Sequence, residues 1–219
     1  LLRRQRQMCI RDRPNAPFVV EGDEYDTAFF DKGPKFLHYR PKIAVLNNIE
    51  FDHADIYDDI HEIIENFERL VDIMGPETCL IANGDDSIVQ ACASKTRGDL
   101  IWFGLGANAD VRAEEINENE SGVRFRLFEK DHEVGVVQSP MSGRHNVSNV
   151  LAAFAVCRQY GVSYADLMTA LPNFLGTDKR QDEKGTFDEV LIVDDFAHHP
   201  TAIRETLSGL KKKYVGRRV

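Results

Sequence analysis

The alternation of two kinds of apolar pattern constrains the fold of this chain more than any other feature. Short apolar runs, typical of buried strands, are followed by segments in which apolar residues recur at the spacing of one helix face. In the clearest unit, the strand-type run 42–49 precedes an amphipathic segment, 60–74, with Asp58 or Asp59 as its N-cap. Strands are predicted at 18–20, 42–49, 78–82, 100–103 and 190–193, and helices at 60–74, 86–93, 146–160, 164–171 and 200–213. This order predicts an α/β fold.

One region departs from the alternation of strands and helices. Between residues 110 and 138, single apolar and polar residues alternate, and turn-forming pairs stand at 121–122 and 130–131. This pattern predicts an antiparallel ribbon inserted into the α/β fold. The segment 172–185 is polar and contains glycine, so it is the best candidate for a linker.

Charge, hydropathy and cysteine spacing exclude several classes of protein. The formal net charge of −9 argues against a general nucleic-acid binder, which needs a basic surface. No apolar run approaches the roughly 20 residues that span a bilayer, so no transmembrane role is expected. The four cysteines form no C-x-x-C pair, which argues against a disulfide framework and favours a reducing cytoplasm. Nothing in the sequence indicates the oligomeric state.

The first thirteen residues differ in composition from the rest of the chain. They contain five arginines and one aspartate, with neither an apolar helical period nor the apolar core of a signal peptide. We expect this segment to be non-native, of the kind that translated adaptor sequence produces. The alternative is a basic arm that binds RNA or a membrane surface.

Two polar clusters follow predicted strands, where α/β proteins gather ligands. The segment 21–26 holds four carboxylates, which form either a solvated loop or a cation site. The segment 47–55 combines carboxylates and amides with His53, and this donor set suits magnesium or manganese better than zinc. A structural role for His53 stays equally open.

A third cluster joins the strand 190–193 to the helix that begins at Pro200. It contains two aspartates, Asp194 and Asp195, and two adjacent histidines, His198 and His199. Free N–H groups at a helix N-terminus favour phosphate. Because adjacent histidines rarely point toward one ion, phosphate or nucleotide contact is expected of them rather than shared metal ligation.

A fourth motif, 143–149, opens the helix rich in alanine and valine. Asn146 is either a plain N-cap or a side chain that reads the edge of an adenine, because an amide offers a donor and an acceptor together. Each of these motifs is weak alone, and their order along the chain makes them specific.

That order resembles the Mur ligase family, the ATP-dependent amide-forming enzymes of bacterial cell-wall synthesis. The segments that carry the resemblance are VVEGDEYD (19–26), LNNIEFDHAD (46–55), SGRHNVSNVLAAFAV (142–156), FLGTDKRQD (174–182) and DDFAHHPTAI (194–203). They are most similar to the branch that joins a recycled murein tripeptide to UDP-N-acetylmuramate in peptidoglycan recycling. The branch that adds L-alanine to UDP-N-acetylmuramate is the alternative.

The resemblance implies roles for individual residues. Glu21 and His53 match the family's Mg²⁺ ligands, with Asn48 and Asp52 beside them. The remaining matches concern ATP: Asn146 and Asn149 for the adenine, Arg180 for the nucleotide from the interdomain hinge, Asp195 for the ribose, and His198 and His199 for the phosphates. The family reaction transfers a phosphoryl group to the muramoyl carboxylate, and the peptide amine then attacks the acyl phosphate.

The resemblance also implies a domain organisation. Residues 14–175 are expected to form most of a central ATPase domain, 176–185 a hinge, and 186–219 the start of a Rossmann-like C-terminal domain. The chain contains no Gly-Lys pair and therefore no G-x-x-x-x-G-K-[ST] phosphate loop. The 219-residue chain is accordingly expected to be a fragment that is inactive as a ligase alone.

Two functions from other classes stay open at this stage. A nucleotide- or metal-binding module without catalysis would use the same motifs. A metal-dependent phosphohydrolase would use the clusters that contain Glu21 and His53, and would turn over phosphate esters without an amine.

Overall fold

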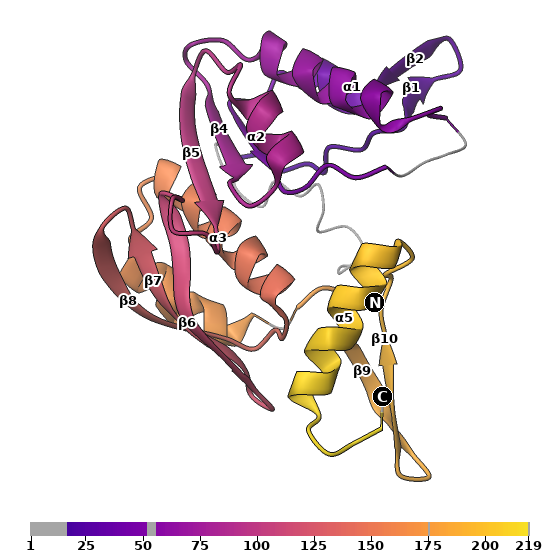
Figure 1. Cartoon of the computed structure of the whole chain (residues 1–219), viewed down its shortest axis with the longest axis vertical. Helices are drawn as coiled ribbons and strands as arrows, with labels where there is room; N and C mark the ends of the chain where they lie inside the picture. Colours follow the sequence, from indigo (N-terminus) through magenta and orange to yellow (C-terminus); the bar gives the residue numbers. More distant parts are fainter. Residues whose placement is uncertain (1–16, 52–55, 175, 219) are drawn as a thin grey trace.

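The computed structural model describes residues 17–51, 56–174 and 176–218. In chain order, its elements are β1 (Asp26–Ala28), β2 (Asp31–Pro34), the 3₁₀ helix η2 (Lys35–His38), β3 (Ile43–Leu46), α1 (Ile60–Ile73), β4 (Cys79–Asn83), α2 (Ser87–Ala93), β5 (Asp99–Gly104), β6 (Val111–Asn119), β7 (Gly122–Glu129), β8 (His132–Ser139), α3 (Arg144–Gln159), α4 (Tyr164–Ala170), the 3₁₀ helix η3 (Leu171–Asn173), β9 (Asp182–Phe187), β10 (Val190–Asp194) and α5 (Pro200–Lys213). The predicted α/β class is confirmed (Figure 1). None of the helices in these ranges is long and apolar enough to cross a membrane.

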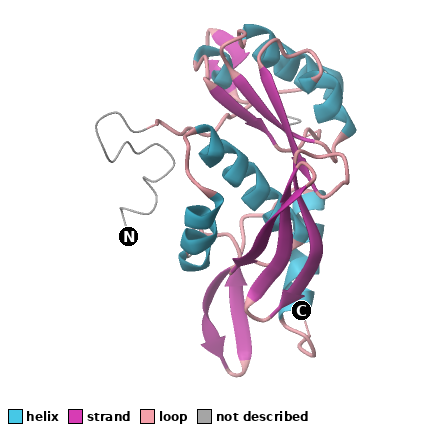
Figure 2. Cartoon of the chain, turned by 90° about the vertical axis from the view of Figure 1, so that its left-hand side faces the viewer, coloured by secondary structure: helices cyan, strands magenta, loops and turns pink. Residues whose placement is uncertain are grey.

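A six-stranded sheet in the order β3-β4-β5-β6-β7-β8 organises the larger part of the molecule. The first four strands are parallel to one another, whereas β7 and β8 are antiparallel to their neighbours. The predicted antiparallel ribbon is therefore present, and its turns lie at 120–121 and 130–131. Helices lie on both sides of the sheet (Figure 2).

Strand β4 is buried on both faces, which explains its uninterrupted apolar sequence. Cys79 and Ile81 belong to a core with α3 and the antiparallel ribbon. Leu80 and Ala82 alternate with them and belong to a second core, with α1 and α2. One strand thus connects two hydrophobic cores.

Local capping fixes where the helices on the second core begin. The carboxylate of Asp59 accepts hydrogen bonds from the N–H groups of His61 and Glu62, at 2.7 and 3.3 Å, so Asp59 is the N-cap of α1. The Asp86 carboxylate caps α2 in the same way, through Ile88 and Val89. Both helices begin close to their predicted positions.

The predicted strand at 18–20 is wrong. These residues form no strand, and Phe18 and Val19 are 59% and 70% exposed. A strand needs a neighbour for its backbone groups, and no described strand pairs with this segment. The sequence pattern also missed the hairpin of β1 and β2, which is too short to show an apolar period.

The C-terminal segment, residues 182–218, forms a two-stranded antiparallel sheet and a helix. The sheet pairs β9 with β10, and α5 follows them. The polar stretch expected to be a linker as far as residue 185 is shorter than predicted, because β9 begins at Asp182. Strand pairing with β10 decides this, and the polar sequence of β9 gives no apolar signal for it.

The two-core arrangement predicts a large loss of stability when β4 is truncated. We expect Ile81→Ala to lower the free energy of unfolding by about 3 kcal/mol, because the side chain is fully buried and its removal leaves a cavity. Ile73→Ala removes the same atoms from a residue that is 43% exposed and should cost less than about 1 kcal/mol. Urea unfolding of both variants measures the difference, and equal losses would contradict the assignment of β4 to the core.

Candidate nucleotide site

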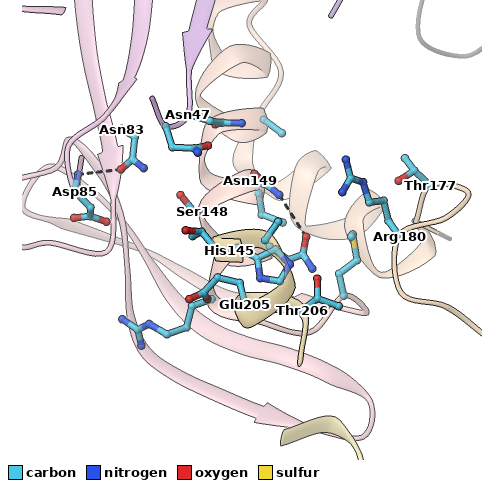
Figure 3. A pocket seen from close by; sticks show the side chains of 18 of the residues that line it. Asn47, Asn83, Asp85, His145, Ser148, Asn149, Thr177, Arg180, Glu205 and Thr206 are labelled. Atoms are coloured by element: carbon cyan, nitrogen blue, oxygen red, sulfur yellow. Dashed lines mark hydrogen bonds between the residues drawn. The ribbon is translucent and has the colours of Figure 1, made fainter. Parts of the chain in front are cut away.

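A cleft of about 1460 Å³ lies where the sheet, helix α3 and the C-terminal segment meet. Its walls include the residues that follow β3 and β4, the first turns of α3, residues 177–181, and α5 (Figure 3). It therefore lies at the carboxyl ends of parallel strands, which is where open α/β sheets bind their ligands.

Helix α3 contributes the two asparagines predicted for adenine. Asn146 is 4% exposed, and its Nδ2 donates to the carbonyl oxygen of Ser142 at 2.7 Å. Asn149 is exposed, and its Nδ2 lies 3.4 Å from Asn146 Oδ1 (Figure 3). Asn146 is not the N-cap, because the helix begins one residue after Gly143. The two amides form a pair in which Asn149 is the more accessible.

His145 faces the same cleft, and the sequence analysis gave it no role. Burial lowers the pKa of the imidazole, although the nearby carboxylates of Glu205 and Asp195 oppose this effect. Its Nδ1 is buried and has no hydrogen-bond partner in the described part of the chain. The signal was its place beside Asn146 in a motif that had already been singled out.

The hinge region contributes Arg180 and Asp195. The guanidinium of Arg180 lies 5.8 Å from the centroid of the Phe196 ring, and the side chain is exposed. The Asp195 carboxylate accepts hydrogen bonds from the backbone N–H groups of Gln181 and Ala197, at 2.9 and 2.8 Å. Asp195 thus connects the hinge to the start of α5, and any contact with a ribose would be additional to these bonds.

The two adjacent histidines diverge, as expected. His199 lines the cleft, with Nε2 3.2 Å from the carbonyl oxygen of Phe51 and Nδ1 3.3 Å from the Glu50 carboxylate. His198 is outside the cleft lining, and its Nδ1 lies 3.0 Å from the carbonyl oxygen of Phe196. Of these two adjacent histidines, only His199 lines the cleft.

The predicted metal site is not assembled among the described residues. Glu21 is exposed and does not line the cleft, whereas Glu24 of the same segment does. His53, together with Asp52, lies outside the described residues. Within the described ranges, no group of three histidine, cysteine or acidic side chains is placed to hold a metal ion. Because His53 and Asp52 lie outside these ranges, the predicted pair of metal ligands stays a prediction, and no chemical step is assigned to a metal.

Two aspartates that the sequence analysis did not single out as site residues shape the rim of the cleft. Asp85 accepts hydrogen bonds from the N–H groups of Leu105 and Gly106, at 2.5 and 2.9 Å. Asp86, besides capping α2, accepts from the N–H of Ile49 at 3.3 Å. These bonds tie together the residues that follow β3, β4 and β5. Their position after a predicted strand was the signal that could have found them.

Comparison with known proteins identifies the family. The family description "Mur ligase middle domain" matches residues 18–157, which is more than half of the chain. The chain belongs to the Mur ligase family.

Relatives from two branches of the family match the chain. The UDP-N-acetylmuramate–L-alanyl-γ-D-glutamyl-meso-2,6-diaminoheptandioate ligase of Haemophilus influenzae is 38% identical over 202 residues, 91% of this chain and 43% of the relative. The UDP-N-acetylmuramate–L-alanine ligase of Clostridium acetobutylicum is 34% identical over 195 residues, 89% of this chain and 41% of the relative. A crystal structure of a murein peptide ligase from Psychrobacter arcticus matches with a TM-score of 0.71 and 36% identity, covering 95% of this chain and 44% of that one. The chain thus spans less than half the length of these relatives.

The burial of His145 predicts a pH dependence of stability. Because its folded pKa lies below that of the unfolded chain, the unfolded state takes up the proton first. Stability is therefore lost as the pH falls from about 6.5 toward the folded pKa, by at most about 1.4 kcal/mol per pH unit. The charged side chains that act on the imidazole are Glu205, Asp195, Glu118 and Arg180.

Urea unfolding at pH 7.5 and 5.5 measures this dependence. We expect His145→Gln to lose less stability than the unmodified chain over this interval, because glutamine does not titrate. His132→Gln, at an exposed position in β8, is the matched control and should leave the slope unchanged. Equal slopes for His145→Gln and the unmodified chain would contradict the prediction.

Proposed function

We propose that this chain supplies the nucleotide cleft of an ATP-dependent ligase that joins a murein tripeptide to UDP-N-acetylmuramate. One observation carries the proposal. Asn146, Asn149, Arg180 and Asp195 are spread over 50 positions of the sequence, and all four line a single cleft. These are the residues for which the family resemblance implies contacts with the adenine, the ribose and the rest of the nucleotide.

In the proposed complex, each wall of the cleft has a distinct task. The Asn149 amide hydrogen-bonds the adenine edge. Asn146 orients the Asn149 side chain, because its Oδ1 accepts a hydrogen bond from Asn149 Nδ2. Arg180 offers an exposed cation to the nucleotide from the hinge. His199, at the N-terminus of α5, faces the cleft beside Glu50. In this position it contacts the phosphates of the bound nucleotide.

The proposed reaction forms and breaks two bonds in sequence. A carboxylate oxygen of the muramoyl group attacks the γ-phosphorus of ATP, and ADP leaves. The peptide amine then attacks the acyl carbon, loses a proton and expels inorganic phosphate, which leaves an amide. Positive charge must offset the approach of two anions in the first step, and Arg180 and the N-terminus of α5 supply part of it here.

The choice of substrate rests on the relative identities. Identity is 38% with the tripeptide ligase of Haemophilus influenzae and 34% with the L-alanine ligase of Clostridium acetobutylicum. We therefore propose UDP-N-acetylmuramate and the tripeptide as substrates, in the cytoplasm, with the L-alanine ligase as the alternative. Neither nucleic acid nor a membrane is a proposed partner.

Mg²⁺ is the proposed cofactor beside ATP, with Glu21 and His53 as its ligands. This assignment rests on the match of 19–26 and 46–55 to the family motifs. The metal would supply positive charge at the phosphates when bound.

Nucleotide binding by the 219-residue chain tests the cleft directly. We expect Asn149→Ala to weaken binding of a non-hydrolysable ATP analogue roughly tenfold, because the adenine edge loses a donor and an acceptor. The exposed Asn108 lies outside the cleft lining, and Asn108→Ala should bind like the unmodified chain. Isothermal titration calorimetry measures both affinities. Equal affinity for the guanine analogue, or no effect of Asn149→Ala, would remove the adenine assignment.

The ligase reaction is tested in the whole protein of which this chain is proposed to be a part. We expect ADP release that requires both UDP-N-acetylmuramate and the tripeptide, and no such release from the 219-residue chain. If Glu21 and His53 hold the metal, Glu21→Gln and His53→Ala raise the Mg²⁺ concentration for half-maximal activity, whereas Glu120→Gln on the exposed β6–β7 turn does not. Hydrolysis of simple phosphate esters with Mn²⁺ and no amine would favour the phosphohydrolase instead.

A further inference from the structure

Glu118, at the end of β6, carries a carboxylate that the proposed function does not use. Its side chain is only 6% exposed. One oxygen accepts a hydrogen bond from the Lys212 ammonium of α5 at 2.7 Å, and the other accepts from the backbone N–H of Gly143 at 3.1 Å. A buried carboxylate is costly unless its oxygens are satisfied, and here two distant parts of the chain satisfy it.

The Gly143 N–H stands at the start of a helix, where N–H groups have no acceptor within the helix itself. Gly143 is the N-cap residue of α3, has a φ of 100° and offers no side chain. Glu118 therefore provides an acceptor at the N-terminus of α3, where negative charge is favourable. Lys212 balances that charge from α5, so the helix that carries Asn146 and Asn149 is joined to the C-terminal segment.

Two further contacts reach Gly143 and its neighbour Ser142. Helix α5 approaches so closely at Gly209 that a Cβ there would lie 3.2 Å from Gly143 Cα. The Gln181 amide in the hinge donates to the carbonyl oxygen of Ser142 at 3.2 Å. Helix α5 accordingly packs beside α3 and β6 (Figure 1).

We propose that Glu118 is a positioning residue that locks α5 onto the start of α3. The lock couples the placement of the C-terminal segment to the setting of the asparagine pair in the nucleotide cleft. The locking itself depends only on the contacts above, whereas its effect on nucleotide affinity rests on the proposed function.

Hydrogen exchange in the 219-residue chain without nucleotide tests the lock. Glu118→Gln keeps an acceptor for Gly143 but removes the ion pair, and Lys212→Met removes the same pair from the other side. We expect each to speed amide exchange in α5, and at the start of α3, by roughly three- to tenfold. Lys211→Met removes a neighbouring exposed charge that has no ion pair in the described part of the chain, and should leave exchange unchanged.

The combination of variants separates a shared lock from two independent surface effects. The double variant Glu118→Gln/Lys212→Met should exchange no faster than either single variant, because each already breaks the same contact. Additive effects, or exchange in all three variants equal to that of Lys211→Met, would overturn the proposal. Gly209→Val tests the same packing by a different change. A valine side chain should push α5 away from the start of α3 and speed exchange in α5, even though the intrinsic helix propensity of valine exceeds that of glycine.

Nucleotide titrations distinguish this inference from the proposed function. We expect Glu118→Gln and Lys212→Met to weaken binding of the ATP analogue by a similar factor, roughly threefold. Lys212→Arg keeps the positive charge and should bind the analogue as tightly as the unmodified chain does. Faster exchange with unchanged affinity would retain the lock and refute its coupling to the cleft. If the unmodified chain binds no nucleotide, the proposed function fails while the exchange result still decides the lock.

Discussion

The burial of β4 on both faces is the constraint on which the rest of this structure depends. Ile81 faces the core with α3, and Leu80 faces the core with α1 and α2. Neither layer of helices can pack without this strand, because each covers only one face of the sheet. The strand ends at Asn83, so the element that joins the two cores also positions Asp85 and Asp86 at the rim of the cleft.

Three of the carboxylates that line the cleft accept hydrogen bonds from backbone N–H groups. Asp85 ties the end of β5, Asp86 caps α2, and Asp195 accepts from the hinge. Acidic side chains that satisfy N–H groups shape a site without leaving its full negative charge available to repel an anion. This offers a physical account of how an acidic chain, with a formal charge of −9, can present the proposed nucleotide cleft.

The cleft is composite, because its walls come from parts of the chain that touch only in the folded state. Arg180 and His199 belong to the hinge and the C-terminal segment, whereas Asn149 belongs to α3. Contacts such as that between His199 and Glu50 hold these parts together. The geometry of a composite site changes whenever its segments move relative to one another, which makes the contacts between segments part of the site.

Sequence periodicity determined the fold class, the antiparallel ribbon and the helix starts, because local spacing and capping decide those features. Motif order indicated the family and several of the residues that line the cleft. Only the tertiary structure decided that residues 18–20 form no strand and that β9 begins at Asp182, since a strand exists through its neighbour. It also decided that His199 enters the cleft while His198 does not, and that Glu118 meets Lys212 across 94 positions. Such pairings depend on how distant elements pack, and no local pattern records that.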